Sequence, residues 1–153
     1  MSVLKLNKDE IIQILNIKPP FLFVDKIDVF SLSKSALGQK KLTSVEWFFN
    51  CHLPAEHVMP GTLLTEAMLQ TLVAIIYSIE GHVGKIAFVT EMNTKLLSKA
   101  SPGDDLLIEA KLTSFERGIS KGEATVSKNK QKKVCFGEFT FVSPHALPKP
   151  RLQ

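Results

Sequence analysis

Apolar residues dominate the segment 63–79, where they lie on every side of a helical wheel. A helix that is apolar all round is buried, so this pattern predicts a long helix at the centre of the fold. Pro60 and Gly61 stand immediately before the segment, and proline is favoured in the first turn of a helix. Gly81 follows the segment, and glycine commonly ends helices.

The rest of the chain shows a shorter helical pattern and several strand patterns. Asn7, followed by two acidic residues, predicts an N-cap and first turn for a short helix over residues 7–16, which the prolines at 19–20 stop. The connector 46–50 has the length of about one helical turn. Six segments that are apolar or alternating predict strands: 20–30, 35–43, 85–99, 104–115, 119–128 and 132–142.

One long buried helix thus follows two predicted strands and precedes four others. The economical arrangement is an α+β fold in which an antiparallel sheet curls around the helix. A length of 153 residues suits a single domain, 1–153, that buries a substantial core. We place this core at about residues 19–142 and expect the proline-rich tail, 144–153, to be flexible.

Composition narrows the class of protein. Hydrophobic residues make up 44% and charged residues 22% of the chain, as in ordinary soluble globular proteins. No uncharged apolar run approaches the roughly 18 residues that span a bilayer, and the first residues lack the apolar centre of a secretory signal. Cys51 and Cys135 form no CxxC pair and indicate neither a disulfide framework nor a zinc site. We therefore expect a cytoplasmic protein with two reduced thiols and no membrane span.

The chain carries a formal net charge of +4, and much of its basic excess lies late in the sequence. A positive field favours acidic partners, and nucleic acid and an acidic carrier protein are the two candidates. The basic stretch SKNKQKK, residues 127–133, has no interleaved aromatic residues of the kind that stack on bases. We interpret it as a solvated hairpin turn and expect no nucleic-acid partner.

Candidate chemistry gathers in the stretch CHLPAEHVMPGTLLTEAM, residues 51–68, which runs into the predicted central helix. Glu66 lies early in this apolar helix, where burial raises the pKa of a carboxyl group and suits it to act as a general acid. His52 lies in the preceding loop, and imidazole is the natural base near neutral pH. Gly61 begins the helix, whose first backbone N–H groups are free to bind a developing oxyanion. The three groups together fit removal of a proton beside a carbonyl and loss of a group one carbon further on.

Each of these residues also has a simpler interpretation. Glu66 can lie on a solvent-exposed stripe or pair with a lysine, and a loop histidine such as His52 is most often structural or solvated. The other three histidines are given no role on the same ground. Cys51 beside His52 suggests a thiol nucleophile, but residues adjacent in sequence usually point apart and no third orienting group is visible. Cys135, on a predicted strand, is interpreted as core.

The stretch WFFNCHLPAEHVMPGTLLTEAMLQ, residues 47–70, resembles the signature of the FabZ-type 3-hydroxyacyl-acyl-carrier-protein dehydratases. In that family a G-H-F-P-G segment is followed by V-M-P-G and then, four residues later, by E-A-M-x-Q, and this chain keeps the spacing throughout. PFLFVDKI and KLLSKASPGDDLLIEAKL resemble two further stretches of the family, so the resemblance covers residues 19–142.

The resemblance implies a hotdog fold, which is a sheet wrapped around a central helix. It also implies dehydration of a 3-hydroxyacyl thioester to the trans-2-enoyl thioester, in fatty acid synthesis or in a specialised acyl-chain pathway. His52 falls on the family's catalytic histidine, which takes the C2 proton, and Glu66 falls on its catalytic glutamate, which protonates the departing hydroxyl. The N–H of Gly61 would polarise the thioester carbonyl. Glutamate rather than aspartate at position 66 favours dehydration without isomerisation of the double bond.

The same resemblance implies the partners. No metal or redox cofactor is needed, because the thioester itself acidifies C2, and the substrate arrives on the phosphopantetheine arm of acyl-carrier protein. Family members form homodimers, often trimers of dimers, with each active site at the dimer interface. The histidine then comes from one subunit and the glutamate from the other.

The loop around His52 departs from the family's pattern. Cys51 and Ala55 replace two glycines and would be strained if those glycines need a positive φ, although we expect a related loop path with a different pocket mouth. Leu53 replaces a phenylalanine, and Glu56-His57 stands at two variable positions, where Glu56 can pair with a lysine. These departures keep two alternatives open: a non-catalytic acyl-chain-binding or scaffold subunit and, on the same fold, an acyl thioesterase.

Overall fold

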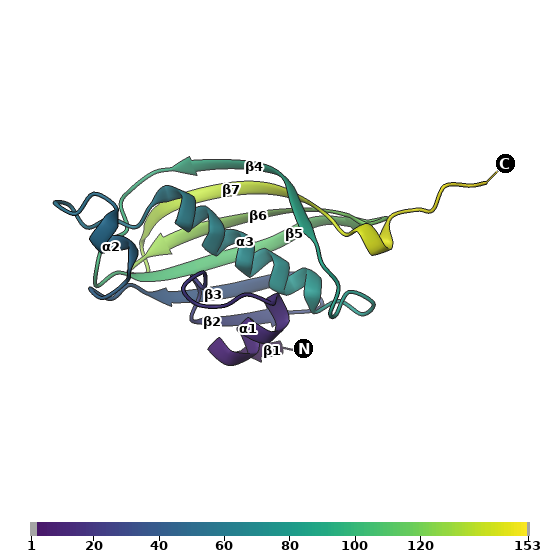
Figure 1. Ribbon diagram of the computed structural model, residues 1–153, viewed down its shortest axis with the longest axis horizontal. Helices are drawn as coiled ribbons and strands as arrows, with labels where there is room; N and C mark the ends of the chain where they lie inside the picture. Colours follow the sequence, from purple (N-terminus) through teal and green to yellow (C-terminus); the bar gives the residue numbers. More distant parts are fainter. Residues whose placement is uncertain (1–2, 153) are drawn as a thin grey trace.

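The computed structural model describes residues 3–152 and has the sheet-wrapped helix that the sequence predicts (Figure 1). All seven strands belong to one antiparallel sheet, in the order β1-β2-β3-β5-β6-β7-β4. The strands are β1 (Val3–Leu6), β2 (Lys26–Phe30), β3 (Ser35–Lys41), β4 (Phe88–Leu96), β5 (Asp105–Glu116), β6 (Ile119–Lys128) and β7 (Lys132–Val142). The helices are α1 (Lys8–Leu15), α2 (Phe48–Cys51), α3 (Gly61–Tyr77) and the 3₁₀ turn η1 (Pro144–Ala146). This is the hotdog arrangement, and the expected α+β class is confirmed.

Helix α3 is buried around most of its circumference, as its all-round apolar pattern predicts. It contacts α1 and five strands of the sheet. Two glycines let the sheet approach it closely. A Cβ on Gly38 would lie 2.7 Å from Oγ1 of Thr71, and a Cβ on Gly122 would lie 2.8 Å from Cδ2 of Leu72. A larger residue at either position would therefore push the sheet away from the helix. Within residues 3–152, no helix has the length and hydropathy needed to cross a bilayer.

Strands β5, β6 and β7 form two hairpins whose turns use positive φ angles. Arg117 and Gly118 have φ of 52° and 82° in the two-residue turn between β5 and β6, which suits the twist of a hairpin. Asn129 and Lys130 have φ of 52° and 67° between β6 and β7. The basic stretch that contains them is therefore a hairpin turn, as predicted, and the predicted bounds of β6 and β7 are confirmed.

The N-terminal helix is capped as the sequence predicts. The side chain of Asn7 accepts a hydrogen bond from the backbone N–H of Glu10 at 3.0 Å, and the Glu10 carboxylate accepts one from the backbone N–H of Asn7 at 2.8 Å. Before this helix, β1 pairs with β2, although the sequence predicts no strand there. The pairing and the burial of Leu6 attach the start of the chain to the sheet edge.

The predicted strand at 20–30 is only partly correct, because β2 begins at Lys26. The preceding backbone binds a helix side chain instead of a neighbouring strand. Oε1 of Gln70 on α3 accepts a hydrogen bond from the N–H of Phe23 at 3.0 Å, and Nε2 of Gln70 donates to the carbonyl of Phe21 at 2.9 Å. Phe23 and Val24 are buried, as the apolar character of the segment predicts, whereas Phe21 is 49% exposed, and the segment is not part of the sheet.

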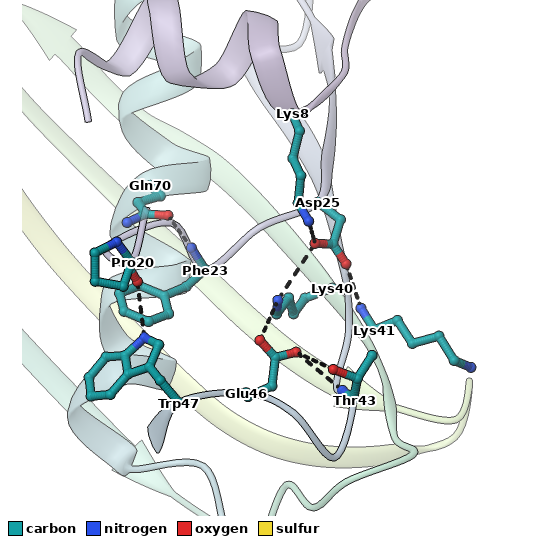
Figure 2. A network of polar contacts seen from close by, with 10 residues as sticks. All are labelled: Lys8, Pro20, Phe23, Asp25, Lys40, Lys41, Thr43, Glu46, Trp47 and Gln70. Carbon is teal, nitrogen blue, oxygen red and sulfur yellow. Dashed lines mark hydrogen bonds and ion pairs between the residues drawn. The ribbon is translucent and has the colours of Figure 1, made fainter. Parts of the chain in front are cut away.

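A network of charged side chains fixes the connection between β3 and α2 (Figure 2). Lys40, only 7% exposed, lies 3.2 Å from a carboxylate oxygen of Glu46 and 3.6 Å from one of Asp25. Asp25 also accepts a hydrogen bond from the backbone N–H of Lys41 at 2.8 Å and pairs with Lys8 at 3.3 Å. Opposite charges thus surround the one buried lysine of this region, and they hold in place the connection that leads to His52.

Strand β4 lies at the end of the sheet, beside β7, and nearly all of its residues are exposed. Three large apolar side chains on it, Phe88, Met92 and Leu96, are 55%, 60% and 58% exposed. Edge strands of monomeric proteins are normally protected by charges or covered by other elements. This apolar edge is therefore a surface on which a further chain can pack.

Candidate active site

Glu66 projects from the second turn of α3 and lines a cavity of about 200 Å³. Its side chain is partly buried, and no ion pair to it occurs within residues 3–152, so pairing with a lysine is not observed. Burial raises the pKa of its carboxyl group above the ordinary value, while a hydrogen bond from Gln70 offsets part of that rise. The carboxyl group therefore keeps its proton to a higher pH than an exposed glutamate does.

The cavity is open to solvent on one side and is lined by one stripe of α3 and by segments from three other parts of the chain. Its lining residues are Glu66, Leu69, Gln70, Val73 and Tyr77 from α3, Leu15 and Ile17 from the end of α1 and the loop after it, Ala87 and Val89 at the start of β4, and Phe141 from β7. Most of these side chains are apolar, and the polar atoms lie toward the two ends of the helical stripe. The cavity therefore suits an apolar ligand that carries a polar group at the Glu66 end.

Gln70 connects Glu66 to the segment before β2 by hydrogen bonds and so fixes the position of one relative to the other. Its side chain is 2% exposed, and Nε2 donates to Oε1 of Glu66 at 3.2 Å in addition to its two bonds with Phe21 and Phe23 (Figure 2 shows the bond to Phe23). All of these bonds are made by one buried amide, so its orientation is determined by its surroundings. Sequence reasoning gave Gln70 no role, although a polar residue four positions after Glu66 on an apolar helix was the available signal.

His52 is the C-cap of α2, and its backbone N–H donates to the carbonyl of Phe48 at 2.9 Å. Its ring nitrogen Nδ1 lies 3.2 Å from the carbonyl oxygen of Val58. A carbonyl oxygen can only accept a hydrogen bond, so Nδ1 carries the proton in the neutral ring. The lone pair of the neutral imidazole is therefore on Nε2, where a base needs it.

The loop around His52 follows a path in which the two residues that replace glycines, Cys51 and Ala55, are not strained. Neither Cys51 nor Ala55 has a positive φ, whereas Leu53, directly after His52, has φ of 49°. The unfavourable backbone angle of this loop therefore lies on a leucine and not on either residue that replaces a glycine. The carboxylate of Glu56 pairs with Lys99, as the interpretation of this residue anticipates.

Gly61 is the first residue of α3, after the N-cap Pro60, which makes no side-chain cap. No acceptor for the N–H of Gly61 occurs within residues 3–152. A Cβ at this position would overlap Cδ1 of Leu96 of β4, so a larger residue would have to displace that leucine side chain. Thr65 strengthens the same junction, because its hydroxyl donates to the carbonyl of Gly61 at 3.0 Å and accepts a hydrogen bond from the hydroxyl of Thr94 of β4 at 3.2 Å. The start of α3 is therefore fixed to the exposed edge strand.

The three candidate residues do not line one cavity within a single chain. Glu66 faces the cavity between α3, α1 and β4, and His52 is not part of the lining of that cavity. Among residues 3–152, no hydrogen bond or ion pair joins His52 to Glu66. Gly61 lies between them in sequence, at the helix end that β4 covers.

The remaining cysteines and histidines lie outside this cavity. The thiol of Cys51 is exposed and donates weakly to carbonyl oxygens at the start of α2. Cys135 is buried next to the sulfur of Met68, as predicted for a core residue, and burial raises the pKa of its thiol to about 11. His82 and His145 contact each other, with ring nitrogens 3.1 Å apart. Across the described part of the chain, no group of three or more His, Cys, Asp or Glu side chains is arranged to hold a metal ion.

Comparison with known proteins identifies the family to which this chain belongs. A family model described as the FabA-like domain matches residues 16–136. A 3-hydroxyacyl-[acyl-carrier-protein] dehydratase FabZ of Syntrophomonas wolfei is 37% identical over 142 residues, which cover 92% of this chain and 98% of that protein. A FabZ of Clostridium botulinum, strain Loch Maree, is 41% identical over 140 residues, covering 90% and 95%. The chain therefore belongs to the FabA-like family and, within it, to the group of the FabZ-type dehydratases.

Solved structures support the same fold at low sequence identity. A hypothetical thioesterase of Streptococcus pneumoniae TIGR4, solved with coenzyme A, superimposes with a TM-score of 0.61 at 12% identity, covering 76% of this chain and 83% of that one. The PaaI protein of E. coli superimposes with a TM-score of 0.58 at 14% identity, covering 72% and 73%. At such identities the likeness concerns the fold alone.

Proposed function

We propose that this protein dehydrates 3-hydroxyacyl thioesters, carried by acyl-carrier protein, to trans-2-enoyl thioesters in fatty acid synthesis. The observation that carries the proposal is the partly buried carboxyl group of Glu66, which has a raised pKa and faces an apolar cavity. Relatives named FabZ, which match over nearly the whole length of both chains, support the same reaction.

Three groups of this chain supply the chemistry. Nε2 of His52 removes a proton from C2 of the substrate, and the electrons of the broken C–H bond form the double bond to C3. The C3–O bond breaks at the same time, and Glu66 gives its proton to the departing hydroxyl, which leaves as water. The N–H of Gly61 donates to the thioester carbonyl oxygen, which gains negative charge as the C2 proton leaves. Proton exchange with solvent then restores both side chains.

The reaction needs no metal or redox cofactor in this proposal. The thioester carbonyl acidifies the C2 proton, and its oxygen is stabilised by a backbone amide at the start of α3. The oxidation states of C2 and C3 taken together do not change when water is lost, so no electron acceptor is required. The polar groups of the chain therefore need only to transfer protons and to stabilise one oxyanion.

The apolar edge of β4 supports a homodimer with its active sites at the interface. This edge strand exposes the side chains of Phe88, Met92 and Leu96, and Val89 of the same strand lines the Glu66 cavity. A second copy that adds to this edge would cover these side chains and reach the cavity. In this arrangement Glu66 of one subunit acts together with His52 of the partner subunit. The dimers can associate further into trimers of dimers.

The substrate carrier is the second partner. The formal charge of +4 favours an acidic protein, and acyl-carrier protein is named as part of the substrate of the relatives. An electrostatic contribution to docking has a clear signature, because it weakens as salt screens the charges. We therefore expect KM for acylated carrier protein to rise with ionic strength.

The experiment that tests the function measures dehydration of 3-hydroxybutyryl-acyl-carrier protein by wild type, His52→Ala and Glu66→Gln. Turnover by wild type and its loss in both variants is the expected result. Absence of wild-type turnover on short, medium and long chains would overturn the proposal. Release of free carrier thiol without water loss would favour an acyl thioesterase, and carrier binding without turnover would favour a non-catalytic acyl-binding subunit.

A mixing experiment tests the shared site. His52→Ala and Glu66→Gln are unfolded together and refolded, so that about half of the dimers contain one chain of each kind. Each mixed dimer has one intact site of two, which predicts recovery of about a quarter of wild-type activity. Recovery of no activity, with wild-type refolding as the control, would contradict a site built from two subunits.

A further inference from the structure

We propose that His82 and His145 form an open binding site for one divalent transition-metal ion, which joins the loop after α3 to the segment after β7. Nδ1 of His82 and Nε2 of His145 lie 3.1 Å apart. The two residues are 63 positions apart in the sequence, so the tertiary structure brings these nitrogens together. Neither residue lines the Glu66 cavity, and the inference does not depend on the proposed function.

The separation of the two nitrogens suits coordination of a single ion. Imidazole nitrogens bind Zn²⁺ at about 2.0–2.1 Å, so two of them 3.1 Å apart subtend an angle of roughly 100° at the ion. This angle lies between the values of octahedral and tetrahedral geometry, which are the common arrangements of divalent metals. The ring planes are inclined at 69°, so the two rings do not stack face to face over the site.

Binding of the ion changes the tautomer of one ring without a net release of protons. In the neutral pair, one of the two facing nitrogens carries a hydrogen and donates it to the other. A metal ion needs a lone pair on both nitrogens, so this hydrogen leaves as a proton and solvent protonates the second nitrogen of the same ring. Both imidazoles stay neutral, as metal ligation requires. The rings also turn so that both lone pairs point at the ion, which their broad χ2 torsions allow.

The backbone on both sides of the site is fixed by hydrogen bonds and close packing. The N–H of His82 donates to the carbonyl of Ile79 at 3.0 Å, in the turn that follows α3. On the other side, the N–H of Ser143 donates to the carbonyl of Gly118 at 2.7 Å. A Cβ on Gly118 would lie 2.8 Å from the backbone nitrogen of Leu147, so η1 packs directly against the turn between β5 and β6. Ligands held in this way lose little conformational entropy when an ion binds.

One ligand of the proposed site is held by packing and the other is accessible to solvent. The ring of His82 packs edge-on against Phe115 of β5, with ring centroids 4.9 Å apart, and the residue is partly buried. His145 is exposed and can adjust its ring to the ion. Water molecules would complete the coordination, because the site has two protein ligands. Imidazole ligands select Zn²⁺, Ni²⁺ and Cu²⁺, whereas Mg²⁺ prefers oxygen ligands.

The test titrates the full-length protein, freed of metal with EDTA and dialysed, with ZnCl₂, NiCl₂ or MgCl₂ in a calorimeter. We expect one Zn²⁺ or Ni²⁺ to bind per chain and Mg²⁺ not to bind. His82→Ala and His145→Ala should each weaken binding by more than about tenfold, because loss of a group that merely orients a ligand already costs about 10- to 100-fold. His57→Ala and Cys51→Ser are the controls, because each removes an exposed metal-binding side chain from the loop around His52, and both should bind as wild type does.

Urea unfolding supplies a second measurement. At a free Ni²⁺ concentration of a hundred times its Kd, the ratio of folded to unfolded wild type should rise about 100-fold, because the ion binds the folded chain. His82→Ala and His145→Ala should lack this rise. Unchanged affinity in both variants would mean that the ion binds elsewhere and would overturn the inference, as would a wild-type Kd weaker than about 1 mM for both Zn²⁺ and Ni²⁺. If His82→Ala fails to fold, His145→Ala decides alone, and an unchanged affinity in it would overturn the inference.

Discussion

Two partly or fully buried charged groups, Lys40 and Glu66, meet opposite surroundings in this fold. Lys40 has carboxylates of Glu46 and Asp25 at 3.2 and 3.6 Å (Figure 2). Glu66 has the neutral amide of Gln70 at 3.2 Å and no cation within ion-pair distance among residues 3–152. Opposite charges compensate the burial of the lysine, whereas no opposite charge in the described part of the chain compensates the burial of the glutamate, and its pKa is raised. The paired Lys40 therefore holds the connection between β3 and α2 in place, whereas the unpaired Glu66 is available for proton transfer.

The largest expected effect comes from removing the uncompensated charge. Glu66→Gln keeps the size of the side chain and loses the transferable proton, so we expect kcat to fall by about 10²- to 10⁴-fold with the fold retained. Steady-state dehydration assays and thermal unfolding measure the two properties. Glu56→Gln is the control, because Glu56 is exposed and pairs with Lys99, and its kcat should stay within about twofold of wild type. Wild-type kcat in Glu66→Gln would contradict the general-acid role.

Removing the compensated charge should act on stability instead. Lys40→Met leaves Asp25 and Glu46 without their shared cation, and we expect the free energy of unfolding to fall by about 2–4 kcal/mol. Lys41→Met is the matched control, because Lys41 and Asp105 are 64% and 67% exposed and their ion pair contributes less than about 1 kcal/mol. Urea unfolding measures both losses. Equal losses in the two variants would show that burial of the lysine does not matter.

A substitution at Gln70 tests how its side-chain amide affects both the stability of the fold and the pKa of Glu66. Gln70→Leu leaves the N–H of Phe23 and the carbonyl of Phe21 without partners, which we expect to cost about 1–3 kcal/mol of stability. It also removes the hydrogen bond that lowers the pKa of Glu66, so that pKa should rise further. Because Glu66 acts in its protonated form, the alkaline limb of the kcat/KM profile should move to higher pH. A limb that stays in place or moves to lower pH would contradict this coupling.

The smallest expected effect is a pH dependence of stability. The folded-state pKa of Glu66 lies above the ordinary 4.5, so the folded protein binds more protons than the unfolded chain as pH rises above that value. The contribution of Glu66 to stability is complete below pH 4.5 and is lost as pH rises through the folded-state pKa. Glu66→Gln lacks this loss and should gain stability relative to wild type between pH 4.5 and neutrality. Urea unfolding of both proteins across this range measures the difference, which should not stay constant.

The sequence predicts most of the sheet because its turns and alternation are local properties. The bounds of β6 and β7 follow from the turn residues between them and from the alternation of small apolar with polar residues. The start of β2 could not be predicted in this way, because the backbone before Lys26 is bound by Gln70, which is far away in sequence. Long-range pairing of a backbone with a side chain leaves no periodic pattern.

The sequence predicts which residue types form the candidate site, but it predicts less well how these residues are arranged in space. The apolar surroundings of Glu66 in the sequence correctly predict a partly buried carboxyl group with a raised pKa. The exposure of β4 is not predictable from its mixed pattern, because it depends on which strand closes the sheet. The separation of His52 from the Glu66 cavity likewise depends on tertiary structure, and the resemblance to the FabZ-type dehydratases, rather than any local pattern, leads us to expect a site shared between subunits.

The burial of Cys135 gives the protein an internal reporter of core opening. With a thiol pKa of about 11, only roughly one molecule in ten thousand carries the reactive thiolate at pH 7. The side chain is also fully shielded from solvent, whereas Cys51 is exposed. In a Cys51→Ser variant, a thiol-reactive dye would therefore label only molecules in which β7 has separated from α3, and the labelling rate would report how often these openings occur.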